Sequence, residues 1–170
     1  MGLKDLPPEK AENVRIGNHL LMITFSLAMM CFLSNIPGSV GNPFSFRMWL
    51  TRCMKRFPHK TQAVFTNVVY CAVGERWRKR TSFLHWLAPA LGGLSCDCIM
   101  RNGLCQYQGK RHLALEGSAP KGGPLTAIAS RYPKNFCRKL ANIVSYQMIA
   151  AHVNTLARLV SPTHPPFDIH

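Results

Sequence analysis

Three cysteines and one histidine in the middle of the chain are the residues best suited to chemistry. They are Cys71, Cys98, Cys105 and His112, and six residues separate both Cys98 from Cys105 and Cys105 from His112. Thiolate sulfur and imidazole nitrogen are the usual ligands of structural zinc, which they hold in tetrahedral geometry. We therefore expect a Cys3His zinc site, with Cys96 as an alternative ligand. The competing interpretation is that Cys71 packs in a strand core and the loop thiols are free.

The chain has seven cysteines in all. Because the number is odd and no clear secretory signal precedes them, we do not expect a disulfide framework. Cys31, Cys53 and Cys137 lie on expected helices and are interpreted as packing residues. Nothing in the sequence places a general base next to a nucleophile, so no nucleophilic catalysis is predicted.

The densest basic cluster of the chain lies between the first two candidate ligands. Its side chains can neutralise phosphates, and its tryptophan can stack on an unpaired base. The alternatives are that the tryptophan packs inward while the charges are solvated, or that the run is a nuclear-localisation signal. Together with two cations before His112, the candidate nucleic-acid-binding residues are Arg76, Trp77, Arg78, Lys79, Arg80, Lys110 and Arg111.

The overall charge favours a polyanionic partner. The chain carries 21 Lys and Arg against 7 Asp and Glu, a net charge of +14 over 170 residues. Asp5, Glu9 and Glu12 fall in the first twelve residues, so the rest is almost purely basic. Nucleic acid is the partner we expect, and a solvated basic face is the alternative. The hydrophobic content of 47% excludes a wholly disordered chain.

The most apolar run, Leu20–Leu33, is short for a membrane span, which needs about 20 residues. We expect it to form a buried helix with Asn18 as its N-cap, and we do not expect membrane contact. The other expected elements are a basic amphipathic helix over Phe44–Phe57, strands within Ala63–Val73, Ser82–Leu87 and His112–Glu116, and a helix from Pro133 to Leu159.

These elements predict a single α/β domain with a small mixed sheet flanked by helices. We expect residues 1–17 to be a polar lead-in, 18–160 to be the domain and 161–170 to be a flexible tail. The candidate ligands Cys98 and Cys105 fall in a long loop, Leu91–Lys110, which carries several glycine turn signals.

Several landmarks occur together along most of the chain. They are Gly17-Asn18-x-Leu20, Asn42-Pro43 with Ser45 and Trp49, Cys71-x-x-Gly74-x-x-Trp77-Arg78-Lys79-x-Thr81, Cys98, Gly103-Leu104-Cys105, Gly109-Lys110-x-His112, Leu115-x-Gly117 and Thr126-x-x-Ala129-x-x-Tyr132-Pro133. Their order resembles an uncharacterised family found in marine protist genomes and in large mobile or viral-like elements.

The resemblance implies the C-terminal part of a class I methyltransferase-like α/β domain. The Asn42-Pro43 turn is similar to the catalytic turn of some DNA methyltransferases, but Gly41 and Phe46 replace the glutamate and serine usual in the family. The chain also lacks a glycine-rich loop after a first strand and an acid for a cofactor ribose. S-adenosylmethionine is therefore not expected to bind this chain alone, and a missing N-terminal half-domain is a candidate partner.

The sequence thus predicts a nucleic-acid-associated, methyltransferase-like accessory or degenerate domain without complete catalysis. Three alternatives stay open: a zinc-stabilised nucleic-acid-binding module, a membrane-anchored basic protein, and an orphan reading frame without an evolved function. An intracellular location is expected, and the basic run also fits a nuclear one.

Overall fold

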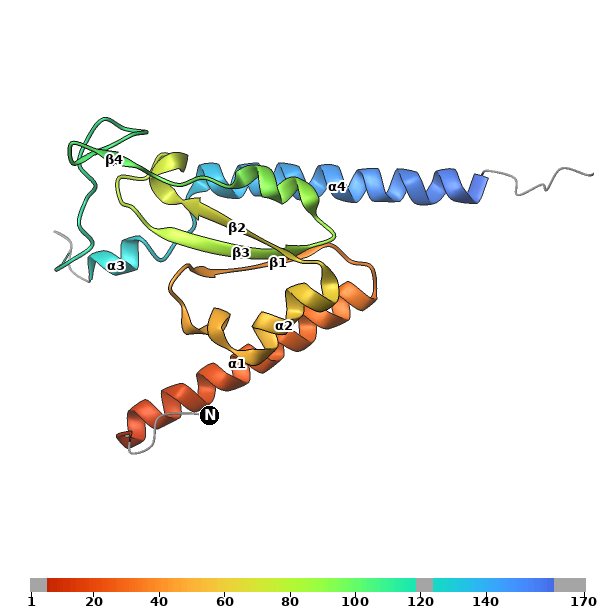
Figure 1. The fold of residues 1–170 in the computed structure, drawn as a ribbon, viewed down its shortest axis with the longest axis horizontal. Helices are drawn as coiled ribbons and strands as arrows, with labels where there is room; N and C mark the ends of the chain where they lie inside the picture. The colour runs from red at the N-terminus through yellow and green to blue at the C-terminus, as the bar shows by residue number, and fades with distance from the viewer. Residues whose placement is uncertain (1–5, 119–123, 161–170) are drawn as a thin grey trace, which may run out of the picture.

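An antiparallel sheet of three strands lies at the centre of the structure, a computed structural model that describes residues 6–118 and 124–160 (Figure 1). The strands are β1 (Gly38–Pro43), β2 (Val64–Val69) and β3 (Arg80–Trp86), in the order β1-β3-β2. In the centre of β3, Leu84 lies opposite Val40 of β1 and Phe65 of β2.

Helices cover both faces of this sheet (Figure 1). The long helix α1 (Pro8–Leu33) and the shorter α2 (Arg52–Thr61) lie on one face, and α4 (Lys134–Val160) lies on the other. The short elements are the 3-10 helices η1 (Arg47–Leu50), η2 (Tyr70–Val73) and η3 (Pro89–Leu94), the two-residue strands β4 (Met100–Arg101) and β5 (Leu104–Cys105), and α3 (Leu125–Ile128).

The alternation of side chains along β3 divides the core between the two layers. Leu84 and Trp86 point toward α1 and α2, where the Trp86 ring lies 5.3 Å from that of Phe57. Phe83 points the other way and lies 5.0 Å from the ring of Phe136 on α4. Because successive side chains of a strand face opposite sides, one apolar strand serves both helical layers.

The expectation of a mixed helix and sheet domain is confirmed, but the sheet differs in detail. Within residues 6–118 and 124–160 every strand pair is antiparallel, so the expected mixed sheet is wrong. The methyltransferase-like interpretation stays a prediction. The expected strands within Ala63–Val73 and Ser82–Leu87 are found as β2 and β3. His112–Glu116 is not a strand, and β1 lies in a stretch for which no strand was expected.

Helix α1 differs most from its expectation. It begins at Pro8, so Asn18 lies inside the helix and is not its N-cap. A fully buried helix was also wrong, because Ala28 is its only buried residue among those that the structure describes. Leu21 and Phe25 contact the core, but the apolar run has side chains all round the helix and α2 and the sheet take only one side. By length and composition α1 could cross a membrane.

Gly41 of β1 gives the first testable prediction. A methyl group on Gly41 would lie 2.5 Å from Cε1 of Phe83 and 2.9 Å from the hydroxyl of Tyr132. Phe83 is 6% exposed and packed against Phe136, so it has little room to move. Gly41→Ala is therefore expected to lower the free energy of unfolding by about 1–3 kcal/mol, measured by urea denaturation.

Gly93 of η3 is the matched control, since a methyl group there meets no atom within 4 Å. Gly93→Ala should leave stability unchanged or slightly raised. Equal stability of the Gly41 and Gly93 variants would show that the Phe83 ring moves aside, and that packing does not exclude a side chain at Gly41.

Candidate metal centre and the adjoining basic residues

A tight hairpin brings Cys98 and Cys105 together. Strands β4 and β5 pair with Met100 opposite Cys105, and Asn102 and Gly103 form the turn between them with φ of 51° and 75°. Positive φ at both central residues is the requirement of a type I′ hairpin, which Asn-Gly satisfies better than other pairs. The chain therefore reverses within a few residues, and the two cysteines are brought to the same side of the loop.

Cys71 reaches the same place from the sheet. It lies in η2, directly after β2, and Gly74 ends this helical turn with a φ of 101°. The amide of Cys96 donates to the carbonyl of Asn67 at 2.8 Å, which holds the chain that leads to Cys98 beside β2.

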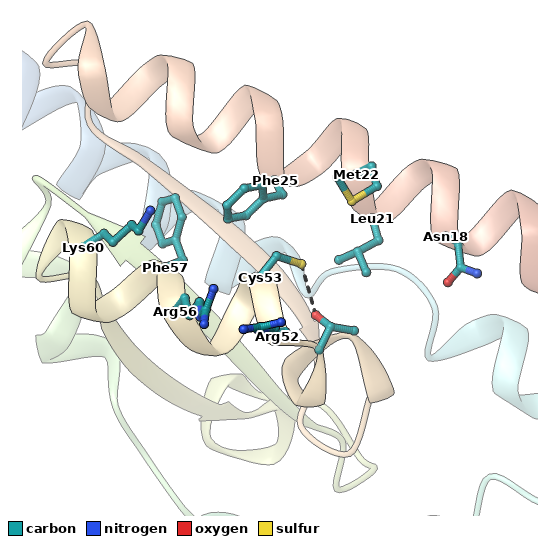
Figure 2. A pocket seen from close by; sticks show the side chains of 10 residues that line it. Asn18, Leu21, Met22, Phe25, Arg52, Cys53, Arg56, Phe57 and Lys60 are labelled. Carbon is teal, nitrogen blue, oxygen red and sulfur yellow. Dashed lines mark hydrogen bonds between the residues drawn. The ribbon is translucent and has the colours of Figure 1, made fainter. Parts of the chain in front are cut away.

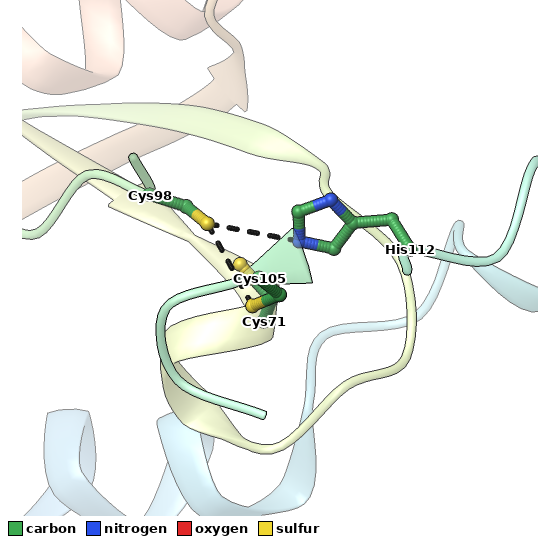
Figure 3. Close-up of side chains that lie close together, drawn as sticks. All are labelled: Cys71, Cys98, Cys105 and His112. Atoms are coloured by element: carbon green, nitrogen blue, oxygen red, sulfur yellow. Dashed lines mark hydrogen bonds between the residues drawn. The ribbon is translucent and has the colours of Figure 1, made fainter. Parts of the chain in front are cut away.

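Two backbone hydrogen bonds position His112. The amide of Cys105 donates to the carbonyl of Lys110, and the amide of Leu113 donates to the carbonyl of Arg76, both at 2.8 Å. The residues on either side of His112 are thus tied to β5 and to the segment after η2, and its imidazole points toward the thiols (Figure 3).

The four ligand atoms lie within 4.8 Å of one another (Figure 3). Sγ of Cys98 is 3.7 Å from Sγ of Cys105 and 3.7 Å from Nε2 of His112. Zinc–sulfur bonds of about 2.3 Å in a tetrahedron place two sulfurs about 3.8 Å apart, whereas a disulfide requires about 2.05 Å. The expected convergence is confirmed, and the group Cys71, Cys98, Cys105 and His112 could hold a metal ion.

The three thiols are buried and the imidazole is half-buried. Burial raises the pKa of Cys71 to about 12, and the neighbouring Cys98 and Cys105 add to this effect. Burial also acts to raise the pKa of Cys105, but hydrogen bonds from the backbone of Tyr107 and from Cys98 outweigh it, so this pKa is lowered. Cys105 is thus closer to its thiolate form than Cys71, and a bound cation would replace the thiol protons.

Two polar residues that sequence reasoning missed support this group. The carboxylate of Asp97 accepts a hydrogen bond from the amide of Cys98 at 2.8 Å, and its carbonyl accepts one from the hydroxyl of Tyr107 at 2.7 Å. The side-chain nitrogen Nε2 of Gln108 donates to the backbone carbonyls of Cys71 and Glu75. Such outer contacts fix the orientation of ligands.

The remaining cysteines lie outside this group. Cys96, the alternative ligand, packs between Val69 and the α4 side of the core. Cys31 and Cys53 pack partly buried against the core formed with α1 and α2, as expected, whereas Cys137 is exposed.

The candidate nucleic-acid-binding residues separate into two sets. Arg76, Arg78, Lys110 and Arg111 are exposed, and the guanidinium of Arg78 also lies 3.6 Å from the carboxylate of Asp97. The other two cations, Lys79 and Arg80, make internal contacts.

The ammonium of Lys79 donates to the carbonyl of Ala129 at 2.7 Å, and burial lowers its pKa. The guanidinium of Arg80 lies 4.3 Å from the ring centroid of Phe44 and 3.5 Å from the carboxylate of Asp97. Both side chains therefore have structural partners, and a role in nucleic-acid binding stays a prediction for all seven residues.

Trp77 is half-buried, and its buried Nε1 has no hydrogen-bond partner in the part of the chain that the structure describes. It lines a hollow of about 420 Å³ together with Tyr132, Arg131, Lys134 and the acidic Glu75. The inward packing of Trp77 is thus partial, and the hollow beside it holds an aromatic ring, two cations and one carboxylate.

Comparison with known proteins adds no relative: no protein-family model, curated protein or solved structure matches this chain.

Proposed function

We propose that this chain is a zinc-stabilised nucleic-acid-binding module. The observation that carries this proposal is the convergence of Cys71, Cys98, Cys105 and His112, which come from η2, a loop, β5 and the segment after it. Ligand residues that are distant in sequence lie within 4.8 Å of one another, and two of their separations, 3.7 Å each, are close to those around a tetrahedral zinc ion.

The donor set favours zinc in a structural role. Three thiolates and one imidazole are soft and borderline ligands, which suit Zn²⁺ better than the oxygen-seeking Mg²⁺ or Ca²⁺. A full set of four protein ligands leaves no open position for water or substrate, unlike a catalytic zinc site. The ion would therefore act by joining the loop 96–113 to the end of β2.

The position of the exposed cations supports a nucleic-acid partner. Lys110 and Arg111 immediately precede the ligand His112, and the hydrogen bond from Leu113 to the carbonyl of Arg76 holds this segment beside the basic cluster. A metal bound to His112 would fix these cations side by side. Ordered cations on one surface neutralise adjacent phosphates, and this contact releases counterions.

The test combines metal analysis with binding of a single-stranded RNA and a duplex DNA probe. We expect one zinc per chain, an affinity for at least one probe that falls linearly as log salt rises, and weaker binding after chelation. A purified, folded protein without zinc would contradict the metal proposal. An affinity that does not change with salt would contradict the phosphate contact, whichever probe is bound.

A further inference from the structure

The apolar surface of α1 has no cover within the described chain. Leu20, Ile23, Leu27 and Met30 are 58%, 55%, 56% and 62% exposed, and they follow one another at helical spacing. A helix that is apolar on all sides is normally enclosed, either in a protein core or in lipid. Among the described residues, the core packs mainly against the other side of the helix, through Leu21, Phe25 and Ala28.

A groove of about 520 Å³ runs between α1 and α2 (Figure 2). Leu21, Met22 and Phe25 of α1 and Phe57 of α2 give it an apolar lining. Three cations line its α2 side: Arg52, Arg56 and Lys60. They are four residues apart, so they occupy successive turns on one side of α2.

We propose that the exposed side of α1, together with the cations of the neighbouring α2, docks on the surface of an anionic phospholipid bilayer. The bilayer supplies the two things that the face lacks, an apolar phase for α1 and negative charge for the α2 cations. None of the described residues that line the groove is acidic. A second copy of this chain would bring the same three cations and a further +14 net charge, which makes it the less suitable partner.

The contacts between α1 and α2 indicate that α1 lies along the membrane surface and does not span it. The rings of Phe25 and Phe57 are 6.1 Å apart. Because α1 and α2 pack together in this way, inserting α1 into a bilayer would carry α2 with it. A spanning α1 would carry Arg52 and Arg56 into the hydrocarbon, where charged side chains are strongly disfavoured. At the surface, the same cations can reach the headgroups while α1 contacts the acyl chains.

Vesicle co-sedimentation of the purified full chain tests this proposal. We expect binding to phosphatidylcholine vesicles that contain roughly 30% phosphatidylserine at about 0.1 M salt, and little binding to phosphatidylcholine alone. The triple variant R52Q/R56Q/K60Q should partition about 100-fold more weakly. Leu27→Glu, which changes an exposed residue, should also weaken binding because it places a negative charge against the bilayer.

The matched control is R76Q/K110Q/R111Q, which removes three exposed cations beside the metal group and should keep most of the vesicle binding. Circular dichroism and zinc content establish that each variant is folded. Equal losses from the two triple variants, or no binding to anionic vesicles, would overturn the proposal. A dimer in solution that Ile23→Glu dissociates would also overturn the proposal, because α1 would then be covered by a second copy. Loss of affinity for a duplex DNA probe in R52Q/R56Q/K60Q would overturn it as well, because the α2 cations would then bind DNA.

Discussion

Replacing Cys98 with serine is expected to lower the zinc affinity of this protein by at least about 100-fold. Loss of a residue that only hydrogen-bonds to a ligand lowers metal affinity by up to about 100-fold, and loss of a ligand itself should cost at least as much. Cys98 is the most informative ligand because its sulfur lies 3.7 Å from both Cys105 Sγ and His112 Nε2. A hydroxyl is a poorer zinc ligand than a thiolate, and the remaining three ligands would leave one position open. Competition with a chromophoric chelator measures the change.

The matched control for this prediction is Cys96→Ser, two residues away. Cys96 is a cysteine of the same loop, but it packs against the core and lies outside the ligand group. Its replacement should leave zinc affinity within about tenfold of the parent protein, since only packing near the site changes. If Cys96→Ser lowered zinc affinity more than Cys98→Ser, Cys96 and not Cys98 would be the fourth ligand.

Loss of the ion should also be visible in the loop itself. The amides of Cys105 and Leu113 are hydrogen-bonded to Lys110 and Arg76 in a segment with little regular structure. These bonds depend on the loop being held in place. Hydrogen exchange at the two amides is therefore expected to accelerate in Cys98→Ser far more than exchange at the amides of β3.

The ligand group could be predicted from residue types, but its geometry needed the turn. Cys98 and Cys105 are too far apart in sequence for an ordinary zinc motif, and only the reversal at Asn102-Gly103 makes their spacing suitable. The Asn-Gly pair is a hairpin signal in its own right, so the sequence contained this information. The supporting contacts of Asp97 and Gln108 have no such signal, because they depend on which carbonyls the folded loop presents.

The strands show why sequence reasoning succeeded in one place and failed in another. β2 and β3 are rich in β-branched and aromatic residues, which predict buried strands directly. β1 contains Gly38, Gly41 and Pro43, which usually indicate a turn. These glycines lie against the rings of Trp86 and Phe83, which leave no room for a side chain, so a tertiary contact overrides a local propensity.

Helix α1 shows a limit of a different kind. Its apolar composition predicts a helix correctly, but burial depends on how much surface the rest of the fold can cover. With a three-stranded sheet and the short α2 beside it, the described chain covers one side only.

Removing three exposed cations near the metal group is the second change with a large expected effect. R76Q/K110Q/R111Q should lower nucleic-acid affinity about 100-fold near 0.1 M salt, because each lost phosphate contact removes about 0.7–0.9 from the slope of log affinity against log salt. The slope itself should fall by about two to three. Fluorescence anisotropy of a labelled probe over a salt series gives both values.

Net charge alone would produce part of this result, so the control must remove equal charge elsewhere. R52Q/R56Q/K60Q does so on α2, which lies across the sheet from α4 and away from the hairpin β4–β5 (Figure 1). If the basic residues beside the metal group form the contact surface, the α2 variant should retain most of the slope. Equal slopes in the two variants would mean that the probe senses the +14 charge of the whole chain and not a site. The salt slope of R76Q/K110Q/R111Q can also be compared with that of the parent protein with and without zinc. If the two slopes differ only when zinc is bound, the ion is what holds Lys110 and Arg111 beside Arg76.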